Sequence, residues 1–343
     1  MDNKCSFGAR KYLLRAALIP HPMKKKAFKL PPPVEDVDIN EISTVKDLMD
    51  QLGRGGGFTA KKAYEAATIL RDMVKSDSCY TFLSFPACII STGCRGVIKE
   101  LVKRKWVDCV ITTCGTLDHD LARIWRKYHH GSFEMDDADL YHKGVHRLGN
   151  VLIPLDSYGI ILEKKMGELM EDIWSSGKRE FGTREIVREV GLRLKDESSI
   201  TYWAAKNDIP IYLPGPTDGA FGSQLWMWRQ THKDLRLDLF KDEQELADIV
   251  FSEKETGALI IGGGISKHHV IWWNQYKDGL DYAVYITTAV EWDGSLSGAR
   301  TREAISWGKL KEKAPHVTLE GDATVLLPLL VAAVDQELRG GDG

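Results

Sequence analysis

The chain has 343 residues, of which 43% are hydrophobic and 28% are charged, and its formal net charge is -3 at pH 7. Length and composition are typical of a soluble globular protein with ample core volume. The small net charge gives no general attraction to nucleic acid or to an anionic membrane, and no apolar run approaches the roughly 20 residues that cross a bilayer. We therefore expect neither nucleic acid nor a membrane as a partner.

The cysteines give no sign of a metal or disulfide framework, because they form no C-x-x-C pair and no zinc spacing. Several stand in apolar runs, where a free cysteine behaves as a small hydrophobic residue. The N-terminal stretch is basic with a short apolar patch, but it lacks the small-residue cleavage site of a signal peptide. We expect a cytoplasmic protein without a metal.

Residues 1–55 have the composition of a peripheral arm. The segment MKKKAFKLPPPVEDVDI, which begins at Met23, combines a lysine cluster with three prolines and acidic residues. Met23 is also an alternative start of the chain. The GRGGG run at 53–57 predicts a flexible joint before the folded body. We expect one catalytic domain over 56–338 and a flexible tail over 339–343.

Strands and helices alternate after this joint. Helical patterns cover 60–75, 91–105, 161–174, 184–194 and 325–334. A further helix carries Tyr202 and Trp203, and we expect Ser198 to cap it. Apolar runs typical of strands cover 80–85, 107–113, 150–154, 209–213, 258–261, 282–287 and 317–319. This alternation predicts an α/β fold, a Rossmann-like and mostly parallel sheet with helices on both faces.

Polar or glycine-rich turns follow the predicted strands. Ligands of such sheets bind at the carboxyl ends of the strands, so these turns are candidate walls of one crevice. The turns are 91–93, 113–118, 217–219, 262–264, 287–289 and 321–323. Asp218 and Asp322 within them have carboxylates suited to ribose hydroxyls.

The densest group of reactive residue types lies between residues 257 and 309. Three glycines follow an apolar run, as in a dinucleotide-binding turn, but Lys267 stands where the third glycine of G-x-G-x-x-G is required. A purely structural turn is therefore an alternative. His268 follows at a predicted helix start, where the positive helix end favours a neutral imidazole that can act as a general base. For His269 a structural role is favoured.

A second group of side chains ends this stretch, because Glu303 and Trp307 lie four residues apart and Lys309 follows Gly308. The alternative is an amphipathic helix with a solvated lysine. A lysine beside an aromatic wall is desolvated, which frees its amine to form a Schiff base. The carboxylate of Glu303 and the face of Trp307 suit a cationic amine substrate.

Several segments together form a highly specific pattern: GGGISKHH, DYAVYITTAVEWDGSLSGAR, EAISWGK and GDAT, with TYWAAKNDIPIYLPGPTDG and KGVHRLGNVLIP upstream. In these segments the chain closely resembles the deoxyhypusine synthase family, over roughly residues 57–334. The resemblance implies a homotetramer of Rossmann-like subunits with NAD bound near subunit interfaces. It also implies transfer of the 4-aminobutyl group of spermidine to one lysine of the translation initiation factor 5A precursor, which forms deoxyhypusine.

The resemblance assigns roles residue by residue. It implies that Lys309 forms the enzyme imine and that His268 assists deprotonation of the amine. It places Asp118, His119, Asp293, Gly294, Ser295, Glu303 and Trp307 in the amine site. It places Ser91, Thr113, Gly115, Asp218, Gly263, Thr288, Ala289, Asp322 and Ala323 in the NAD site.

Four positions depart from the eukaryotic pattern of the family. Ser223 and Leu296 replace aspartates, Trp272 replaces an asparagine, and another asparagine is missing near Cys88. Losing two carboxylates removes ion-pair partners for a cationic substrate. It therefore stays open whether spermidine is bound through other residues or whether a different amine is the donor. Two other functions also stay open: a homospermidine-synthase-like enzyme that delivers to a free diamine, and an NAD-binding regulatory protein without turnover.

Overall fold

The computed structural model describes residues 30–340 and divides the chain into two units, one up to Val34 and one from Glu35 onward. Residues 30–34 are exposed and carry no helix or strand. Most of the predicted arm and residues 341–343 of the predicted tail lie outside the described residues. No helix within 30–340 combines the length and the apolar character that crossing a membrane requires. The following description concerns the unit that begins at Glu35.

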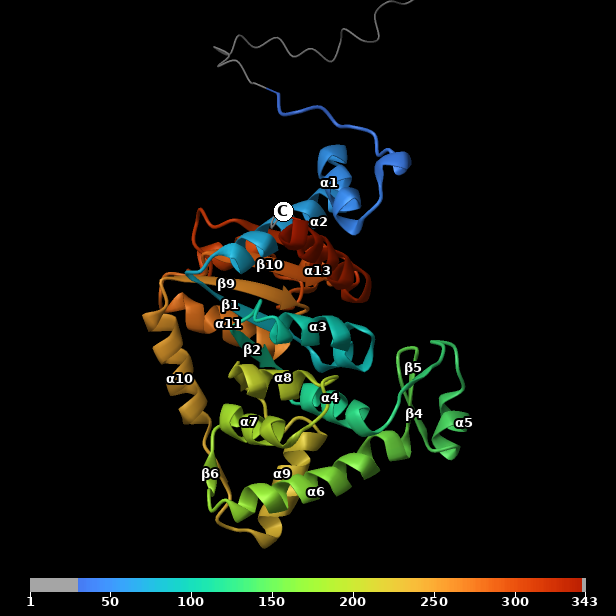
Figure 1. Ribbon diagram of the computed structural model, residues 1–343, viewed down its shortest axis with the longest axis vertical. Coiled ribbons are helices and arrows are strands. Elements are labelled where there is room, and N and C mark those ends of the chain that lie inside the picture. The colour runs from blue at the N-terminus through green and yellow to red at the C-terminus, as the bar shows by residue number, and fades with distance from the viewer. Residues whose placement is uncertain (1–29, 341–343) are drawn as a thin grey trace, which may run out of the picture. The chain divides into compact units, whose positions relative to one another are not determined.

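A six-stranded parallel sheet forms the centre of this unit, in the order β11-β10-β9-β1-β2-β7 (Figure 1). Every neighbouring pair is parallel, which confirms the α/β fold expected from the sequence. The strands are β1 (Cys79–Phe85), β2 (Cys109–Thr112), β7 (Ile211–Tyr212), β9 (Glu255–Ile261), β10 (Tyr282–Thr287) and β11 (His316–Glu320).

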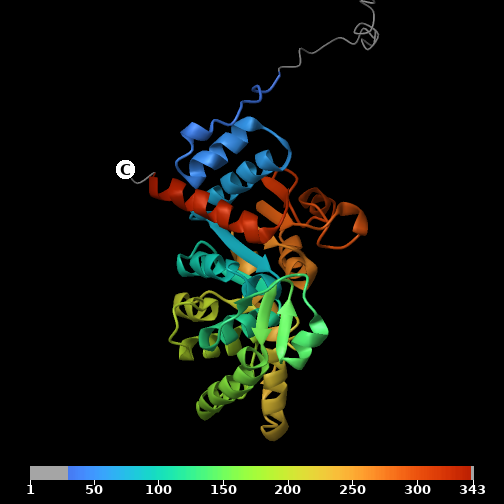
Figure 2. The same ribbon diagram turned by 90° about the vertical axis from the view of Figure 1, so that its right-hand side faces the viewer.

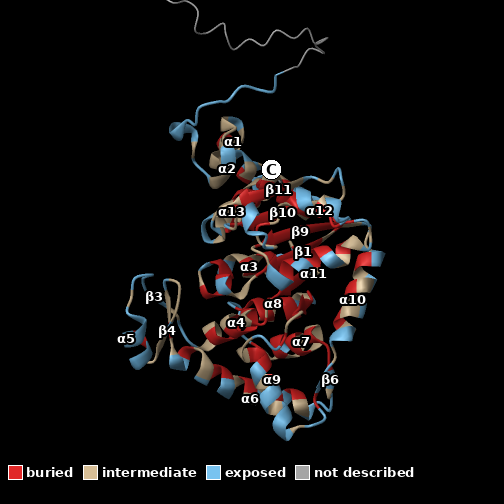
Figure 3. Ribbon diagram, turned by 180° about the vertical axis from the view of Figure 1, so that it is seen from behind, coloured by how far each residue is buried: buried red, intermediate tan, exposed pale blue. Residues whose placement is uncertain are grey.

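Helices cover both faces of the sheet, as the sequence predicts. Successive residues of a strand point to opposite faces, so Phe82 and Leu83 of β1 enter two different hydrophobic cores. One core lies under α2 (Phe58–Lys75), α3 (Cys94–Lys103) and α13 (Ala323–Gly340). The other lies under α10 (Leu239–Ser252), α11 (Gly264–Gln275) and α12 (Thr301–Ser306). Burial on both sides explains why the strands are continuous apolar runs, and Figure 3 shows the buried residues concentrated on them.

Further helices extend the first core beyond β2 and β7: α4 (Gly115–Trp125), α6 (Gly159–Ser175), α7 (Thr183–Arg193), α8 (Ile200–Asn207) and α9 (Ala220–Thr231). An antiparallel sheet in the order β3-β5-β4 projects beside α6, together with a short helix (Figure 1). Its elements are β3 (His129–His130), α5 (Asp137–His142), β4 (Val145–Leu148) and β5 (Val151–Pro154). The remaining short elements are β6 (Glu180–Phe181), β8 (Arg236–Leu237), η1 (Ile39–Glu41), η2 (Ala87–Ser91), η3 (Leu155–Ser157) and η4 (Glu291–Asp293).

The predicted arm reached residue 55, whereas the structure places Glu35 to Gly55 in the compact unit. Helix α1 (Val45–Gly55) packs against α2 and α13, and the three helices lie together in Figure 2. The glycine run is not a free joint, because a Cβ on Gly53 would lie 2.5 Å from the Tyr64 ring. Gly53 thus allows α1 and α2 to approach closely, and Gly56, with φ +65°, makes the turn between them.

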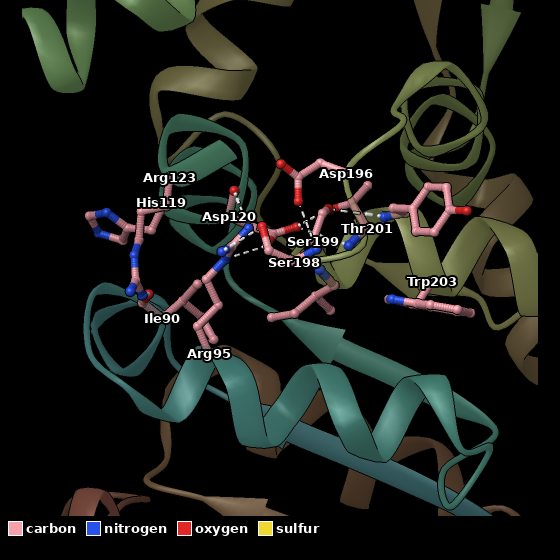
Figure 4. A network of polar contacts seen from close by, with 12 residues as sticks. Ile90, Arg95, His119, Asp120, Arg123, Asp196, Ser198, Ser199, Thr201 and Trp203 are labelled. Carbon is pink, nitrogen blue, oxygen red and sulfur yellow. Dashed lines mark hydrogen bonds and ion pairs between the residues drawn. The ribbon is translucent and has the colours of Figure 1, made fainter. Parts of the chain in front are cut away.

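A buried polar network joins α3, α4 and the start of α8 (Figure 4). The carboxylate of Asp120 accepts hydrogen bonds from Arg95 Nε and from Ser199 Oγ, each at 2.7 Å. The sequence predicts Ser198 as the cap of this helix, but the structure shows Ser199 in that position, where its side chain accepts a hydrogen bond from Tyr202 N. Ser198 instead accepts a hydrogen bond from Arg95, so the capping prediction is wrong by one residue.

Candidate active site

The direction in which the chain crosses the sheet reverses between β1 and β9. From β1 the chain continues to β2 and β7 on one side, and from β9 it continues to β10 and β11 on the other. Open α/β sheets bind ligands at such a reversal, in the crevice at the carboxyl ends of the strands. A Cβ on Gly262 after β9 would lie 3.5 Å from Pro86 after β1, so the two loops are adjacent.

The glycine turn after β9 leaves backbone N–H groups open at the start of α11. Gly262 and Gly264 have φ values of +70° and +72°, which glycine adopts without strain. A Cβ on Gly263 would lie 2.3 Å from Ser297 Oγ, so only a glycine fits beneath this loop. No side chain caps α11, and the same holds for α4 at this edge of the sheet. At the start of α3, Thr92 Oγ1 accepts a hydrogen bond from Cys94 N at 3.2 Å. Uncapped helix N-termini attract phosphate groups, so the edge fits the pyrophosphate of a dinucleotide.

All residues predicted to bind the cofactor lie at this carboxyl edge. They are Ser91 after β1, Thr113 and Gly115 after β2, Asp218 after β7, Gly263 after β9, Thr288 and Ala289 after β10, and Asp322 and Ala323 after β11. The two carboxylates are exposed, and Asp322 also accepts a hydrogen bond from Thr324 N at 2.6 Å. A dinucleotide is longer than a single loop, so it can contact residues from several loops along this edge. The roles of these residues in NAD binding stay a prediction.

Hydrogen bonds connect the loop after β1 to the loop after β2 and to helix α4. Thr113 Oγ1 accepts a hydrogen bond from Ala87 N at 3.0 Å. Arg123 of α4 donates a hydrogen bond to the carbonyl oxygen of Ile90 at 2.6 Å (Figure 4). It donates a second one to the carbonyl oxygen of Thr92, also at 2.6 Å. These bonds fix the backbone on either side of Ser91.

A cavity of about 310 Å³ lies beside the glycine turn, on the face of the sheet that α11 and α12 cover. It brings together Lys309, His268, Glu303 and Trp307, which the sequence groups as the chemistry of an amine site. Its other walls are Lys267, Ile271, Trp272, Tyr285, Leu296, Ala299, Arg300 and Ala304. A mostly apolar cavity with a few convergent polar groups is typical of a small-molecule site.

Lys309 enters the cavity from the end of α12. Gly308, with φ +65°, ends the helix, and the backbone N–H of Lys309 donates to Ala304 O at 2.9 Å. The side chain is only 8% exposed, and its Nζ lies 5.1 Å from the ring centroid of Trp307 and 5.8 Å from that of Trp272. This is the desolvated aromatic setting expected for a Schiff-base lysine.

His268 lines the same cavity. Its ring stacks on Trp272 with centroids 5.5 Å apart. Partial burial and the nearby charge of Lys309 lower the pKa of His268 below its usual 6.5, so the ring is neutral at pH 7. A neutral imidazole beside an amine can act as a general base. His269, by contrast, contacts Trp273 and Glu243.

Lys267 is a feature of the site that the sequence analysis missed, since it was considered only as the residue that breaks a glycine motif. Its side chain is 1% exposed, and its Nζ donates to the carbonyl oxygens of Leu296 and Ala299, both at 2.8 Å. It also lies 4.2 Å from the Tyr285 ring centroid, and burial lowers its pKa to about 8. The available signal was its helical spacing with buried Ile271, which puts a lysine on the inner face of α11.

Asp118 and His119, also predicted for the amine site, lie on α4 and do not line this cavity. The Asp118 carboxylate accepts hydrogen bonds from Ala220 N and Phe221 N at the start of α9 and from Tyr158 Oη. Burial raises the pKa of Asp118. In this chain Asp118 therefore caps α9, while its part in amine binding stays a prediction.

The segment Asp293 to Ser295 is exposed, and Asp293 accepts a hydrogen bond from Ser295 N at 2.6 Å. The cavity takes Leu296, rather than these residues, from this part of the chain. Ser223, which like Leu296 stands where the eukaryotic pattern has an aspartate, is exposed on α9 and donates to Gly219 O.

Between residues 30 and 340 no group of three or more His, Cys, Asp or Glu side chains is arranged to hold a metal ion.

Comparison with known proteins supplies further findings. Residues 47–334 match the family model described as deoxyhypusine synthase. Proteins named "probable deoxyhypusine synthase" from Thermoplasma acidophilum and Ignicoccus hospitalis are 56% and 48% identical to the chain, each over 88% of it and over 96% and 95% of their own lengths. The crystal structure of a "putative deoxyhypusine synthase" from Entamoeba histolytica matches with a TM-score of 0.61 at 22% identity, covering 88% of this chain and 96% of that one, and shows the same fold.

Proposed function

The chain belongs to the deoxyhypusine synthase family and is a transferase, and we propose that it transfers the 4-aminobutyl group of spermidine to one lysine of the translation initiation factor 5A precursor. The observation that carries this proposal is the convergence of Lys309, His268 and Glu303 on one cavity beside the glycine turn. Simple nucleotide binding requires none of these three side chains. A regulatory protein without turnover is therefore the weaker alternative.

NAD is the cofactor that we propose, and when bound it supplies reversible transfer of a hydride. The uncapped starts of α4 and α11 would hold its pyrophosphate, and Asp218 and Asp322 would hold its ribose hydroxyls. The Lys309 side chain is buried, at 8% exposure, although the rim of the cavity is open to solvent. Its burial limits the access of water to an imine on this lysine.

The side chains of the cavity divide the work on the amine. His268 accepts a proton from the donor amine, and the Lys309 amine then takes over the oxidised butyl group as an imine while a diamine leaves. Glu303 pairs with the cationic far end of the butyl group, and Trp307 offers its aromatic face. Transfer of the imine to the acceptor lysine regenerates the free amine of Lys309. We further propose, on the family alone, a homotetramer that works in the cytoplasm.

The test is to incubate the enzyme with NAD and spermidine labelled in its butyl part, and to offer either the factor 5A precursor or putrescine. We expect label in the precursor, and borohydride added during turnover should fix labelled butylamine on Lys309. Lys309→Arg keeps the charge but cannot form the imine, so it should transfer and trap nothing.

Two results would contradict the proposal. Label that enters only putrescine would assign the chain to homospermidine-type transfer, since the same chemistry then serves a free diamine. An active Lys309→Arg variant would remove Lys309 from the mechanism.

A further inference from the structure

The amine of Lys309 faces two indole rings that come from different elements. Trp307 follows α12, and Trp272 comes from the last turn of α11. Their ring centroids lie 5.1 and 5.8 Å from Lys309 Nζ, a distance at which an indole face attracts a cation. The ring of Trp272 is held in place by stacking on His268 and by an edge contact with Tyr276.

None of the charged groups around the cavity pairs with the Lys309 cation, so the two indole rings are its close neighbours. Three cations, Lys267, Arg300 and Lys309, stand against one carboxylate, Glu303. Lys267 is satisfied by its two carbonyl partners. For Lys309 Nζ, the part of the chain from 30 to 340 provides no hydrogen-bond acceptor or ion-pair partner. The two indole faces lie against it, and both rings are themselves exposed to solvent.

Such surroundings distinguish between the two cationic forms of this nitrogen. A primary ammonium ion has three N–H donors, and each aromatic face that lies against it displaces water to which these donors would bond. An iminium ion keeps its positive charge but has a single N–H and an alkyl chain, so less hydration is lost. The attraction of an indole face requires no N–H group, which is why aromatic cages suit alkylated nitrogen cations.

We propose that Trp272 and Trp307 form a two-indole clamp that favours the cationic imine on Lys309 over its free ammonium ion, and that Trp272 thereby sets the fraction of enzyme in the imine form. This inference rests on the proposed function, in which Lys309 is a Schiff-base lysine, and it adds Trp272 to the residues that act on the reacting nitrogen.

The test uses a simple aldehyde in place of the whole reaction. Butanal condenses with the lysine amine to give an imine and water, and a proton from the buffer converts the imine to an iminium ion. Cyanoborohydride then transfers a hydride to the iminium carbon, which leaves N-butyl-lysine. The initial rate of butylation at Lys309, measured by mass spectrometry of its peptide, reports the iminium population. The variants are Trp272→Leu, which removes the aromatic face, and Trp272→Phe, which keeps one.

The matched control is Trp226→Leu, because Trp226 is also exposed but lies on α9 beside a different cavity. We expect Trp272→Leu to slow butylation of Lys309 roughly 3- to 30-fold, the range of a partly desolvated cation–π contact. Trp272→Phe should lose less, and the control should match the wild type. Circular dichroism checks folding, and Trp272→Gln replaces Trp272→Leu if the latter does not fold.

If Trp272→Leu butylates Lys309 at the wild-type rate, the proposal is overturned. It is also overturned if Trp226→Leu slows butylation as much as Trp272→Leu does. The assay contains no NAD, spermidine or protein acceptor. Slowed butylation in an enzyme that transfers nothing from spermidine would refute the proposed function alone. Unchanged butylation in an enzyme that does transfer would refute the clamp alone.

Discussion

At the scale of single residues, the surroundings of His268 in the cavity disfavour its charged form. Burial and the Lys309 charge both disfavour the protonated form of His268, so its pKa lies below 6.5. The adjacent His269 is more buried, and its pKa falls to about 4 through burial and then the charge of His268. Only His268 lines the cavity, so the two neighbours provide a matched pair.

If His268 is the general base, its protonation should produce the acidic limb of the pH profile. Because its pKa is lowered, kcat/KM should hold its plateau down to pH 6.5 and fall only below that value. His268→Gln should lower kcat roughly 10²- to 10⁴-fold, the usual contribution of a general base, and should abolish this limb. Rates from pH 5 to 9 check the prediction. His269→Gln should keep the limb, and a limb that survives in His268→Gln would exclude His268 as the base.

At the scale of elements, the site depends on how α11 holds the loop after β10. Lys267 bonds two carbonyls of this loop, and Thr287 Oγ1 donates to a third, Ser297 O, at 2.9 Å. The loop in turn covers Gly263 and provides Leu296 to the cavity. The loop that Lys267 holds therefore connects the glycine turn to the cavity that Lys309 enters.

Replacing Lys267 by Met should destabilise the protein and lower kcat, although Lys309 is untouched. Two carbonyls lose their donor, at roughly 1–3 kcal/mol for each group left buried and unsatisfied. Thermal unfolding measures the loss, and hydrogen exchange of residues 290–300 should become faster.

The control is Lys277→Met near the end of the same helix, because Lys277 also bonds two carbonyls, those of Glu253 and Lys254, but lies outside the cavity. It should leave the exchange of this loop unchanged. Normal exchange and kcat in Lys267→Met would show that the lysine does not hold the loop.

At the scale of the whole molecule, two partly buried histidines link stability to pH. Burial lowers the pKa of His119 to about 4, and His269 is lowered to about 4 as well. An unfolded chain protonates these rings near pH 6.5, whereas the folded chain resists until about pH 4. Unfolding therefore takes up protons in this window, and stability falls as the pH drops from 6.5 toward 4.

His119→Gln should remove one of these contributions, which is at most about 3 kcal/mol for a shift of this size. The variant should lose less stability than the wild type between pH 7 and pH 4.5, as urea unfolding at several pH values would measure. Parallel curves for the two proteins would show that His119 does not contribute.

The sequence by itself determined the sheet and its covering helices. Strands that are buried on both faces must be apolar throughout, and the apolar residues of the helices between them recur every three or four residues. It also grouped Glu303, Trp307 and Lys309, which lie within seven residues of one another. Its turns after the strands all fall at the carboxyl edge, since parallel strands place them there by geometry.

Only the tertiary structure decided which side chains meet. It turned Trp272 toward Lys309, placed the Lys267 ammonium on two carbonyls, used Asp118 to cap α9, and packed α1 into the body. Each of these contacts joins elements distant in the chain and depends on how a helix is rotated and where it crosses its neighbour. Local periodicity fixes the buried face of an element, but the partner of each side chain follows from the packing of the whole core.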